Sequence, residues 1–401
     1  MIRHLELVNY RSHEHTSFSL EPLTVFIGPV AGGKSNIFRG LVLLQNAMTR
    51  SPSELFGPGP FSIWAQRHRG EANVAAPIGF RVRVDGLGPQ FQGEEAGYSL
   101  FVNEGPEGPF IAEERLDRYR PQSDLPDQTI FWRRVRRDSY GEFGTFDASD
   151  RSIVGSVRHR KDDPSPNIRF ASAMADQLSL IGYFHLEIGS LTRPSTNPQA
   201  SRIGYRGEDL PAALALLRDN PDTSVMYERI VKQMRDLLPD LDAILLVPVE
   251  PERLGLGFQH RDFRGHLTPL EESDGTLYTL GLLALVHQPS LPLVLAIEEP
   301  ETGLHPRRLR WVLDKLAALA QGQADTHPVQ VLISTHSPYI LDYFYETPEA
   351  VRVVNRIRGK TTVLCLLDAV GKYGITRDQL REAPLGEQWY AGLFEDTAAC
   401  G

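Results

Sequence analysis

The residues Gly28-Pro29-Val30-Ala31-Gly32-Gly33-Lys34-Ser35 have the spacing GxxxxGK[ST] of a phosphate-binding loop. The apolar run 23–27 before them predicts a strand, and the periodic residues 35–48 after them predict a helix. In that setting, backbone N–H groups can surround phosphates and the start of the helix favours negative charge. We expect Lys34 to reach the β- and γ-phosphates and Ser35 to bind Mg²⁺. The alternative is an ordinary glycine-rich turn before a helix.

Two acids, Glu298 and Glu299, end the apolar run that begins at Leu291. Ligands bind at this edge of open α/β sheets, where the strands end. Because neighbouring side chains of a strand point to opposite sides, the two acids need not share a role. We assign Glu298 to the Mg²⁺ shell and Glu299 to the attacking water, as general base. An acidic helix start after a strand is the structural alternative.

A histidine, His336, follows a second apolar strand predicted over 329–334. We place it at the same sheet edge, where its ring could hydrogen-bond a γ-phosphate or the attacking water. A lone histidine is more often structural, but this position favours a catalytic role.

The rest of the sequence predicts the strands and helices that position these motifs. Residues 1–150 indicate a β-rich region with one helix, and helical spacing dominates 151–240. From 241 onward, strands alternate with helices, which favours an α/β fold with a mainly parallel sheet. The expected strands are 2–9, 16–20, 23–27, 79–84, 98–102, a hairpin of 129–135 and 141–146, then 244–249, 256–260, 293–297 and 329–334, with two more near the end. The expected helices are 35–48, 170–180, 210–218, 224–238, 275–287 and 307–320, and 51–70 is expected as a loop.

Composition limits the other classes of function. The chain of 401 residues has a net charge of −9, with 42 basic and 51 acidic residues, so nucleic acid could touch only local patches. Two arginine clusters, 133–137 and 158–161, are the candidates, although a strand would split the first over two faces and favours a solvated hairpin. No apolar run approaches the ~18 residues of a membrane helix, so we expect a cytoplasmic protein without membrane contact. Cys365 and Cys400 belong to no metal or disulfide pattern.

Taken together, these motifs resemble the ABC-type ATPase heads of the SMC, RecF and OLD families. The strand 2–9 with Tyr10-Arg11-Ser12 resembles their first strand and basic turn, and Asn36 completes a GKSN sequence. The segment 298–306 is similar to the EEPE…LHP segment of OLD-like and RecF-like ATPases, and 334–338 to their switch histidine. Glu272-Ser273-Asp274-Gly275-Thr276 resembles their signature, and 385–390 the tail of short RecF-like ATPases without a nuclease domain.

The resemblance implies a P-loop NTPase of ABC-head type that binds ATP and Mg²⁺, with an antiparallel β subdomain and a helical insert. It divides the chain into an N-terminal ATPase lobe (1–150), a mostly helical insert (151–240) and a C-terminal ATPase lobe (241–401). It adds Arg11 and Asn36 to the nucleotide-binding residues. It also implies a head-to-tail homodimer, or a higher oligomer, in which Ser273, Asp274 and Gly275 of one chain cap the nucleotide of the other. A simple helix cap is the alternative for Ser273.

The sequence departs from the family pattern at Val30, which stands in place of Asn, at Glu298, in place of Asp, and at Glu272, in place of Leu. The signature also lacks the second Gly and the Gln that are typical of transporters. The glutamine-loop residue stays open between Gln92, Gln122 and Gln128. The 65 residues after His336 are too few for a typical further domain, so we expect no nuclease activity in this chain.

Three functions remain open at this point. One is an ATPase that drives or gates a DNA-related process in repair or genome maintenance, with DNA as a partner. The second is an ATP-sensing subunit of an anti-phage or toxin–antitoxin system, which acts through a separate effector nuclease. The third is a nucleotide-binding scaffold with little turnover.

Overall fold

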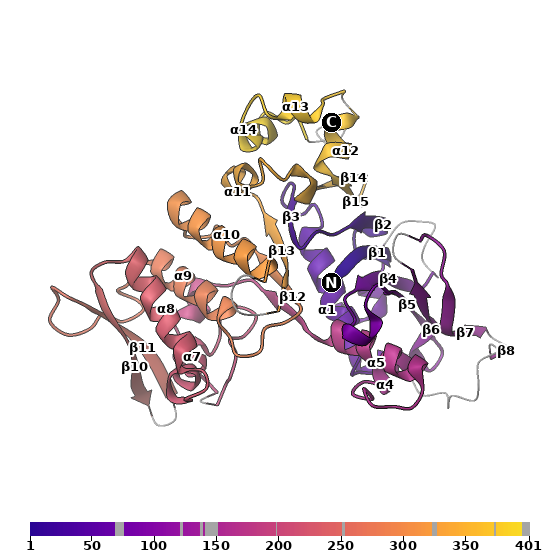
Figure 1. Ribbon diagram of the computed structural model, residues 1–401, viewed down its shortest axis with the longest axis horizontal. Helices are drawn as coiled ribbons and strands as arrows, with labels where there is room; N and C mark the ends of the chain where they lie inside the picture. Colours follow the sequence, from indigo (N-terminus) through magenta and orange to yellow (C-terminus); the bar gives the residue numbers. More distant parts are fainter. Residues whose placement is uncertain are drawn as a thin grey trace. The chain divides into compact units, whose positions relative to one another are not determined.

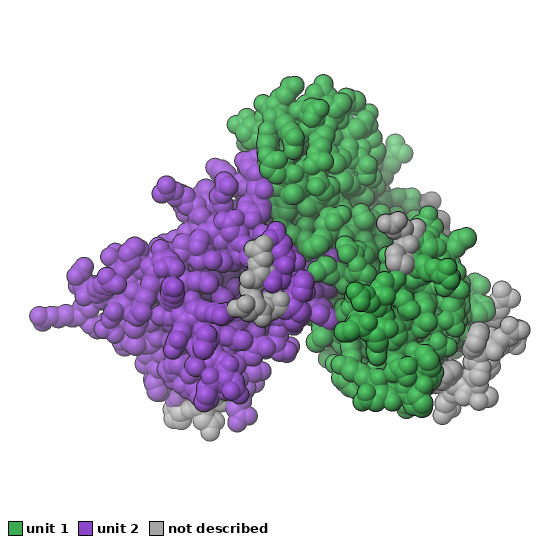
Figure 2. Space-filling model, in the orientation of Figure 1, with its two compact units in different colours: residues 1–182, 344–401 green, residues 183–343 purple. Residues whose placement is uncertain are grey.

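A computed structural model describes residues 1–68, 76–120, 123–136, 139–140, 151–197, 199–250, 253–322, 327–372 and 374–394 of the protein (Figure 1). The chain forms two compact units, which Figure 2 shows in different colours. Unit 1 comprises residues 1–182 and 344–401, and unit 2 comprises residues 183–343. The division at 150 and 240 expected from the sequence stays a prediction.

Unit 1 contains a seven-stranded sheet in which every neighbouring pair is antiparallel. Alternate side chains such as Leu5, Leu7, Phe80 and Leu100 are fully buried, so one face of the sheet packs into the core of the unit. The antiparallel β subdomain expected from the sequence is thus confirmed. Its strands, in sheet order, are β2 (His13–Ser19), β1 (Ile2–Tyr10), β4 (Ile78–Asp85), β5 (Glu95–Gly105), β6 (Gly108–Tyr119), β7 (Gln128–Arg136) and β8 (Ser139–Tyr140).

A second group of strands in unit 1 carries the phosphate-loop motif. β3 (Leu23–Ile27) pairs in parallel with β14 (Val351–Ile357), which pairs antiparallel with β15 (Lys360–Cys365). Residues 23–27 and residues 351–365, which are far apart in the sequence, thus lie side by side. The helix after the motif, α1 (Lys34–Ala47), buries Ile37, Leu41 and Leu44 at helical spacing.

The remaining helices of unit 1 are short, except one. The region expected as a loop, 51–70, contains two helices of four residues, which Ser51 and Ser62 cap by accepting the N–H groups of Glu54 and Ala65. Single turns are too short to show apolar periodicity, so sequence reasoning missed them. The helices of this unit are α2 (Pro52–Leu55), α3 (Ile63–Gln66), α4 (Ile153–Ser156), α5 (Pro166–Ser179), α12 (Leu366–Gly371), α13 (Arg377–Leu380) and α14 (Leu385–Tyr390), with 3-10 turns at Gly59–Phe61, Pro89–Phe91 and Pro348–Ala350.

Unit 2 is built on parallel strands covered by helices. β12 (Val294–Glu298) pairs in parallel with β13 (Gln330–Thr335), and β9 (Ile181–Phe184) is next to β12 in the sheet order. α9 (Asp274–Val286) is buried on all sides from Gly275 to Leu285, as a helix that is apolar all round requires. Its other elements are the hairpin β10 (Leu241–Glu250) and β11 (Arg253–His260), with α6 (Ile188–Leu191), α7 (Leu210–Asp219), α8 (Ser224–Leu237), α10 (Pro306–Ala320) and α11 (Pro338–Tyr343).

The mixed α/β fold with parallel strands is therefore confirmed, with differences at particular elements. Two strands, β6 and β9, were not expected from the sequence. The hairpin arm predicted over 141–146 lies outside the described residues. In the part of the chain that the structure describes, no helix has both the length and the apolarity needed to span a bilayer.

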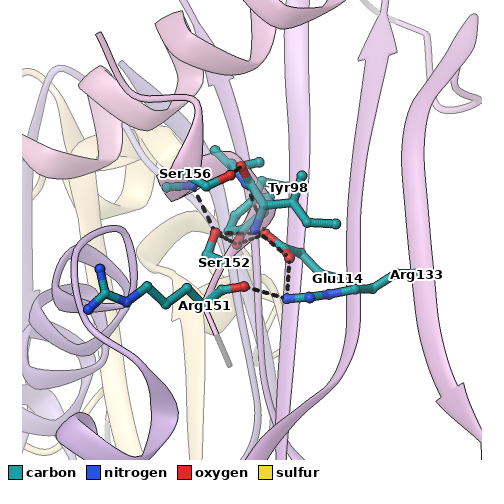
Figure 3. A network of polar contacts seen from close by, with 9 residues as sticks. Tyr98, Glu114, Arg133, Arg151, Ser152 and Ser156 are labelled. Carbon is teal, nitrogen blue, oxygen red and sulfur yellow. Dashed lines mark hydrogen bonds and ion pairs between the residues drawn. The ribbon is translucent and has the colours of Figure 1, made fainter. Parts of the chain in front are cut away.

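A buried carboxylate, Glu114 on β6, joins several elements of unit 1 (Figure 3). It is fully buried, so an unpaired charge there would be strongly destabilising. Five donors satisfy it, and burial raises the pKa of the Tyr98 hydroxyl among them well above its ordinary value. The donors are the hydroxyls of Tyr98 (2.9 Å) and Ser152 (2.7 Å), the guanidinium of Arg133 (2.9 Å), and the N–H groups of Ile153 (2.9 Å) and Val154 (3.2 Å).

We predict that Glu114→Ala lowers the free energy of unfolding by about 3 kcal/mol or more, because buried donors and Arg133 lose their acceptor. Urea unfolding of the purified protein measures this change. The matched control is Glu113→Ala on the same strand, where a partly exposed pair with Arg134 at 3.7 Å is broken. Its expected effect is below about 1 kcal/mol. Equal effects of the two substitutions would contradict the anchoring role of Glu114.

Candidate functional site

The phosphate-loop motif lies between β3 and α1, and close backbone approach explains two of its glycines. The register of β3 and β14 pairs Val353 with Ile27, so Val354 lies against Gly28. A Cβ atom at Gly28 would lie 1.9 Å from the Val354 carbonyl oxygen, and one at Gly33 would lie 2.3 Å from Thr361 Oγ1. Any larger residue at either position would therefore displace β14 or β15.

The loop backbone has two left-handed residues just before the start of α1. Ala31 and Gly33 have left-handed φ angles of 62° and 111°, and among the described residues no side chain caps the first turn of α1. Left-handed residues before an uncapped helix start are typical of loops that bind anions, and the Gly32 N–H closes this loop by donating to the Pro29 carbonyl oxygen at 3.1 Å. Pro29, Val30 and Ala31 are exposed, Val30 at 81%. The departure at Val30 thus changes a solvent-facing side chain and leaves the backbone of the loop in place.

Lys34 is buried and folds back over the loop. Its ammonium donates to the carbonyl oxygens of Gly28 (2.7 Å) and Pro29 (2.9 Å). These are neutral acceptors on the loop itself, so a phosphate oxygen could replace one of them with a stronger, charge-assisted bond. Ser35, the proposed Mg²⁺ ligand, is half-buried in the first turn of α1.

A polar network beneath the loop brings Arg11 and Asn36 together. Arg11 has a left-handed φ of 52°, and its guanidinium donates to Asn36 Oδ1 (3.3 Å) and Gln66 Oε1 (2.8 Å). Asn36 Nδ2 in turn donates to Ser12 Oγ at 3.0 Å. Sequence reasoning named Arg11 and Asn36 but missed Gln66, which lies on the short helix α3 in the region expected as a loop.

A buried histidine that sequence reasoning missed, His13, also supports the loop. Its Nε2 lies 3.3 Å from the Gly33 carbonyl oxygen, and its Nδ1 lies 3.0 Å from Thr16 Oγ1. Burial lowers the pKa of His13 to about 4, so the ring is neutral in the folded protein at neutral pH. Nothing in the strand sequence marks this histidine, because only the tertiary packing places it under Gly33.

In unit 2 the two acids at the end of β12 have different surroundings. Glu298 is the last residue of the strand and is buried, with its Oε2 atom 3.3 Å from His185 Nδ1. Glu299 has a left-handed φ of 47°, and its side chain is partly exposed. Glu299 Oε1 lies 3.2 Å from His336 Nε2, so the structure brings together the two residues assigned to the attacking water.

The surroundings of Glu298 fit a bound cation. Its Oε1 atom is buried and has no hydrogen-bond partner among the described residues. A buried carboxylate oxygen without a donor is costly unless a cation pairs with it. His185 follows β9 directly, and its ring stacks on Tyr205. No sequence signal marked His185, because its neighbour Glu298 is more than a hundred residues away in the chain.

The signature residues form the start of α9. Ser273 is the helix cap, since its hydroxyl accepts the Thr276 N–H at 3.2 Å. A Cβ atom at Gly275 would lie 2.8 Å from the Gly303 carbonyl oxygen, so glycine lets the segment after Glu299 pack against the helix. Ser273 and Asp274 are exposed at this end. The helix cap that was the alternative for Ser273 is therefore present in the structure.

The departure at Glu272 has local partners. Its Oε2 atom lies 2.8 Å from His260 Nε2 at the end of β11, and its Oε1 atom accepts the Ser273 N–H at 2.8 Å. Glu272 therefore connects the β10–β11 hairpin to Ser273, the cap of α9.

The three candidate glutamines gain no support from these contacts. Gln92 and Gln128 are exposed, at the end of a 3-10 turn and at the start of β7, and Gln122 lies outside the described residues. The glutamine-loop residue therefore stays open.

The arginine clusters are paired with acids wherever their side chains are described. Arg133 binds the buried Glu114 and Arg134 faces Glu113, so the strand divides these two arginines as expected. Arg136 and Arg137 contribute no described side chain. In the second cluster, the side chains of Arg158, His159 and Lys161 lie within 4 Å of Asp176, and Arg160 lies near Asp163.

The family described as "AAA domain, putative AbiEii toxin, Type IV TA system" matches residues 23–342, which is more than half of the chain. Among solved structures, an SMC head bound to the C-winged helix domain of ScpA is similar, with a TM-score of 0.52 and 13% identity over 90% of this chain and 96% of that one. The SMC head domain from Thermotoga maritima has a TM-score of 0.43 and 13% identity, over 91% and 98% of the two chains. An SMC head from Pyrococcus furiosus, bound to the C-terminal domain of ScpA, has a TM-score of 0.49 and 13% identity, over 93% and 98%. No curated protein matches the sequence.

We predict that acid destabilises the protein partly through His13. The pKa of His13 is about 4 in the folded protein and 6.5 as a free group, so below pH 6.5 the unfolded chain binds a proton that the folded chain does not. Between pH 7 and pH 5 this should lower the free energy of unfolding by about 2 kcal/mol. His13→Gln should flatten that pH dependence in urea unfolding, whereas His159→Gln, at an exposed histidine of the same unit, should not. An unchanged slope in His13→Gln would contradict the assignment.

Proposed function

Because the chain belongs to the AAA-domain family that residues 23–342 match, and has the fold of an SMC/RecF-like ABC ATPase head, we propose that it binds and hydrolyses ATP. The observation that carries this proposal is the geometry of the phosphate loop. An uncapped helix start, left-handed residues at Ala31 and Gly33, and the Lys34 ammonium lie together on one short loop. These features supply dipoles and charge for a polyphosphate.

Each of the two residues assigned to Mg²⁺ offers a suitable donor. Ser35 Oγ and the Glu298 carboxylate are hard oxygen ligands of the kind that Mg²⁺ prefers, and Glu298 Oε1 is a buried oxygen without a donor among the described residues. When bound, the ion would neutralise charge on the β- and γ-phosphates. ABC heads bind Mg²⁺ through a phosphate-loop serine and a strand-end carboxylate, and we carry these two roles over to Ser35 and Glu298 residue by residue as part of the proposal.

Glu299 and His336 act on the water in this proposal. Glu299 orients the water and accepts its proton as general base, because its carboxylate is partly exposed and already lies beside a histidine. The His336 ring, which lies beside that carboxylate, would hydrogen-bond the γ-phosphate or the attacking water. The 3.2 Å separation of Glu299 and His336 supports these paired roles.

We further propose that ATP closes a head-to-tail homodimer, with a higher oligomer as the alternative. In this arrangement Ser273, Asp274 and the Gly275 N–H at the start of α9 face the γ-phosphate held by the partner chain. The exposed position of Ser273 and Asp274 and the positive end of a 13-residue helix support this role. Hydrolysis would remove the shared phosphate and open the dimer.

Two processes are candidates for the work that this cycle performs. The first is a DNA-related process in repair or genome maintenance, where DNA would stimulate the ATPase. The second is ATP sensing in a toxin–antitoxin or anti-phage system with a separate effector nuclease. The family description, which names an AbiEii-type toxin, favours the second, and the acid-paired arginines give the first little support. Turnover with and without duplex DNA, and co-purification with the product of a neighbouring gene, separate the two.

We predict that Lys34→Ala abolishes ATP binding, because the ammonium that would bind the phosphates is lost. Isothermal titration with ATP and Mg²⁺ measures the affinity, and the melting temperature should stay close to that of the wild type. Lys161→Ala, which removes a mostly exposed ammonium of the same unit, is the control and should bind as the wild type does. Undiminished affinity in Lys34→Ala would refute the phosphate-loop assignment.

We predict that Glu299→Gln traps an ATP-bound dimer. The change keeps the size of the side chain but removes the base, which should lower turnover by ~10² to 10⁴. Light scattering after size exclusion, with ATP and Mg²⁺, should show a stable dimer that is absent without nucleotide.

Adding Ser273→Arg to Glu299→Gln should abolish that dimer, because the bulk lies at the shared phosphate. The control, Ser201→Arg in Glu299→Gln, changes another exposed serine of unit 2 and should leave the dimer intact. Wild-type turnover in Glu299→Gln would exclude Glu299 as the base. Unaltered dimers in the Ser273→Arg double variant would leave Ser273 as a helix cap alone.

A further inference from the structure

A third acid of the same segment, Glu301, is not used by the function proposed above. It lies three residues after Glu298, in the turn between β12 and α10, and burial raises the pKa of its carboxyl group above the ordinary value. Its side chain points toward the end of the neighbouring strand β13, as its hydrogen bonds show.

Glu301 Oε1 accepts two hydrogen bonds from the end of β13. The Thr335 hydroxyl donates to it at 2.6 Å, and the backbone N–H of His336 donates at 3.1 Å. The Thr335 oxygen also accepts the Ser337 N–H at 2.8 Å. One carboxyl oxygen therefore fixes the three-residue turn that carries the His336 ring.

The same turn sets the position of the proposed base. Glu299 N donates to the Ser334 carbonyl oxygen at 2.8 Å, and its side chain meets the His336 ring at 3.2 Å. Three contacts thus hold the segments 299–301 and 334–337 together. They are the backbone hydrogen bond from Glu299 to Ser334, the side-chain contact of Glu299 with His336, and the hydrogen bonds that Glu301 accepts from Thr335 and His336. Removal of Glu301 would free the turn on which the ring depends.

Glu301 differs from Glu298 in its hydrogen bonds. Its Oε1 atom accepts a side-chain hydroxyl and a backbone N–H, both from the end of β13, so this oxygen is already used within the protein. Glu301 instead has the features of a buried acceptor that holds its neighbours in place.

We propose that Glu301 is a positioning residue for hydrolysis, which holds the Thr335–Ser337 turn so that His336 stays against Glu299. The proposal rests on the function proposed above for Glu299 and His336. It assigns Glu301 no contact with nucleotide or metal, so its loss should affect turnover and leave ATP binding unchanged.

The test compares steady-state ATP hydrolysis of the full chain in Glu301→Gln and Glu301→Ala. Glutamine keeps the Oε1 acceptor, so kcat should stay within about threefold of the wild type. Alanine removes the acceptor, so kcat should fall about 10- to 100-fold while KM for ATP changes by less than about twofold. Glu250→Ala, at an exposed acid of the same unit, is the control and should leave both constants unchanged.

Several outcomes would overturn the proposal. They are an unchanged kcat in Glu301→Ala, a rise in KM without a fall in kcat, and a loss in Glu301→Gln as large as that in alanine, which would mean that the carboxylate itself is needed. If Glu301→Ala does not fold, a comparison of kcat in Thr335→Val and Thr335→Ser tests the proposal instead. Only serine keeps the hydroxyl that donates to Glu301, so kcat should fall in the valine variant alone. Equal kcat in those two variants would then reject the proposal.

A parallel assay of Glu299→Gln separates this proposal from the function on which it rests. Wild-type turnover in Glu299→Gln would refute the role of Glu299 as base, whatever Glu301 does. Lost turnover in Glu299→Gln together with full turnover in Glu301→Ala would refute only the positioning role.

Discussion

The close contact between Gly28 and the carbonyl oxygen of Val354 is the constraint on which the phosphate loop depends. The parallel register of β3 and β14 leaves no room for a side chain at Gly28, since a Cβ atom there would lie 1.9 Å from that oxygen. The following strand adds Thr361, whose hydroxyl lies 2.8 Å from both the Gly32 carbonyl and Ser12 Oγ. Three segments far apart in the sequence thus share the support of one loop, and the late strands β14 and β15 are part of that support.

The candidate catalytic groups of unit 2 depend on a parallel register of the same kind. Glu298 pairs with Ser334 at the ends of β12 and β13, so the residues just beyond them leave the sheet at neighbouring points. The left-handed backbone at Glu299 turns its side chain toward His336, while Glu301 reaches back to the turn from which that histidine projects. The positions of the proposed base, of His336 and of Glu301 therefore follow from two strand ends and one unusual backbone angle.

Sequence patterns located the motifs but not the residues that contact them from other parts of the chain. The phosphate loop, both carboxylates, His336 and the main strands and helices are local patterns, set by spacing and apolar periodicity, so a single chain reveals them. His13, Gln66 and His185 have no local pattern, because each acts through a partner brought near by tertiary folding. The single-turn helices α2 and α3 and the strand β6 were missed for a related reason: one turn has no period, and β6 alternates weakly between buried and half-buried residues.

The departure from the family pattern at Glu272 has a physical reason that also bears on the signature assignment. A leucine there could not accept the Ser273 N–H, nor could it pair with His260, which lies 2.8 Å from the Glu272 carboxylate. Glu272 and His260 thus take the place of the usual leucine together, because their polar contact connects β11 to the start of α9. Since Glu272 holds the backbone of the cap residue Ser273 and leaves its side chain exposed, the unusual glutamate is compatible with the proposal that the signature presents its serine to a second chain.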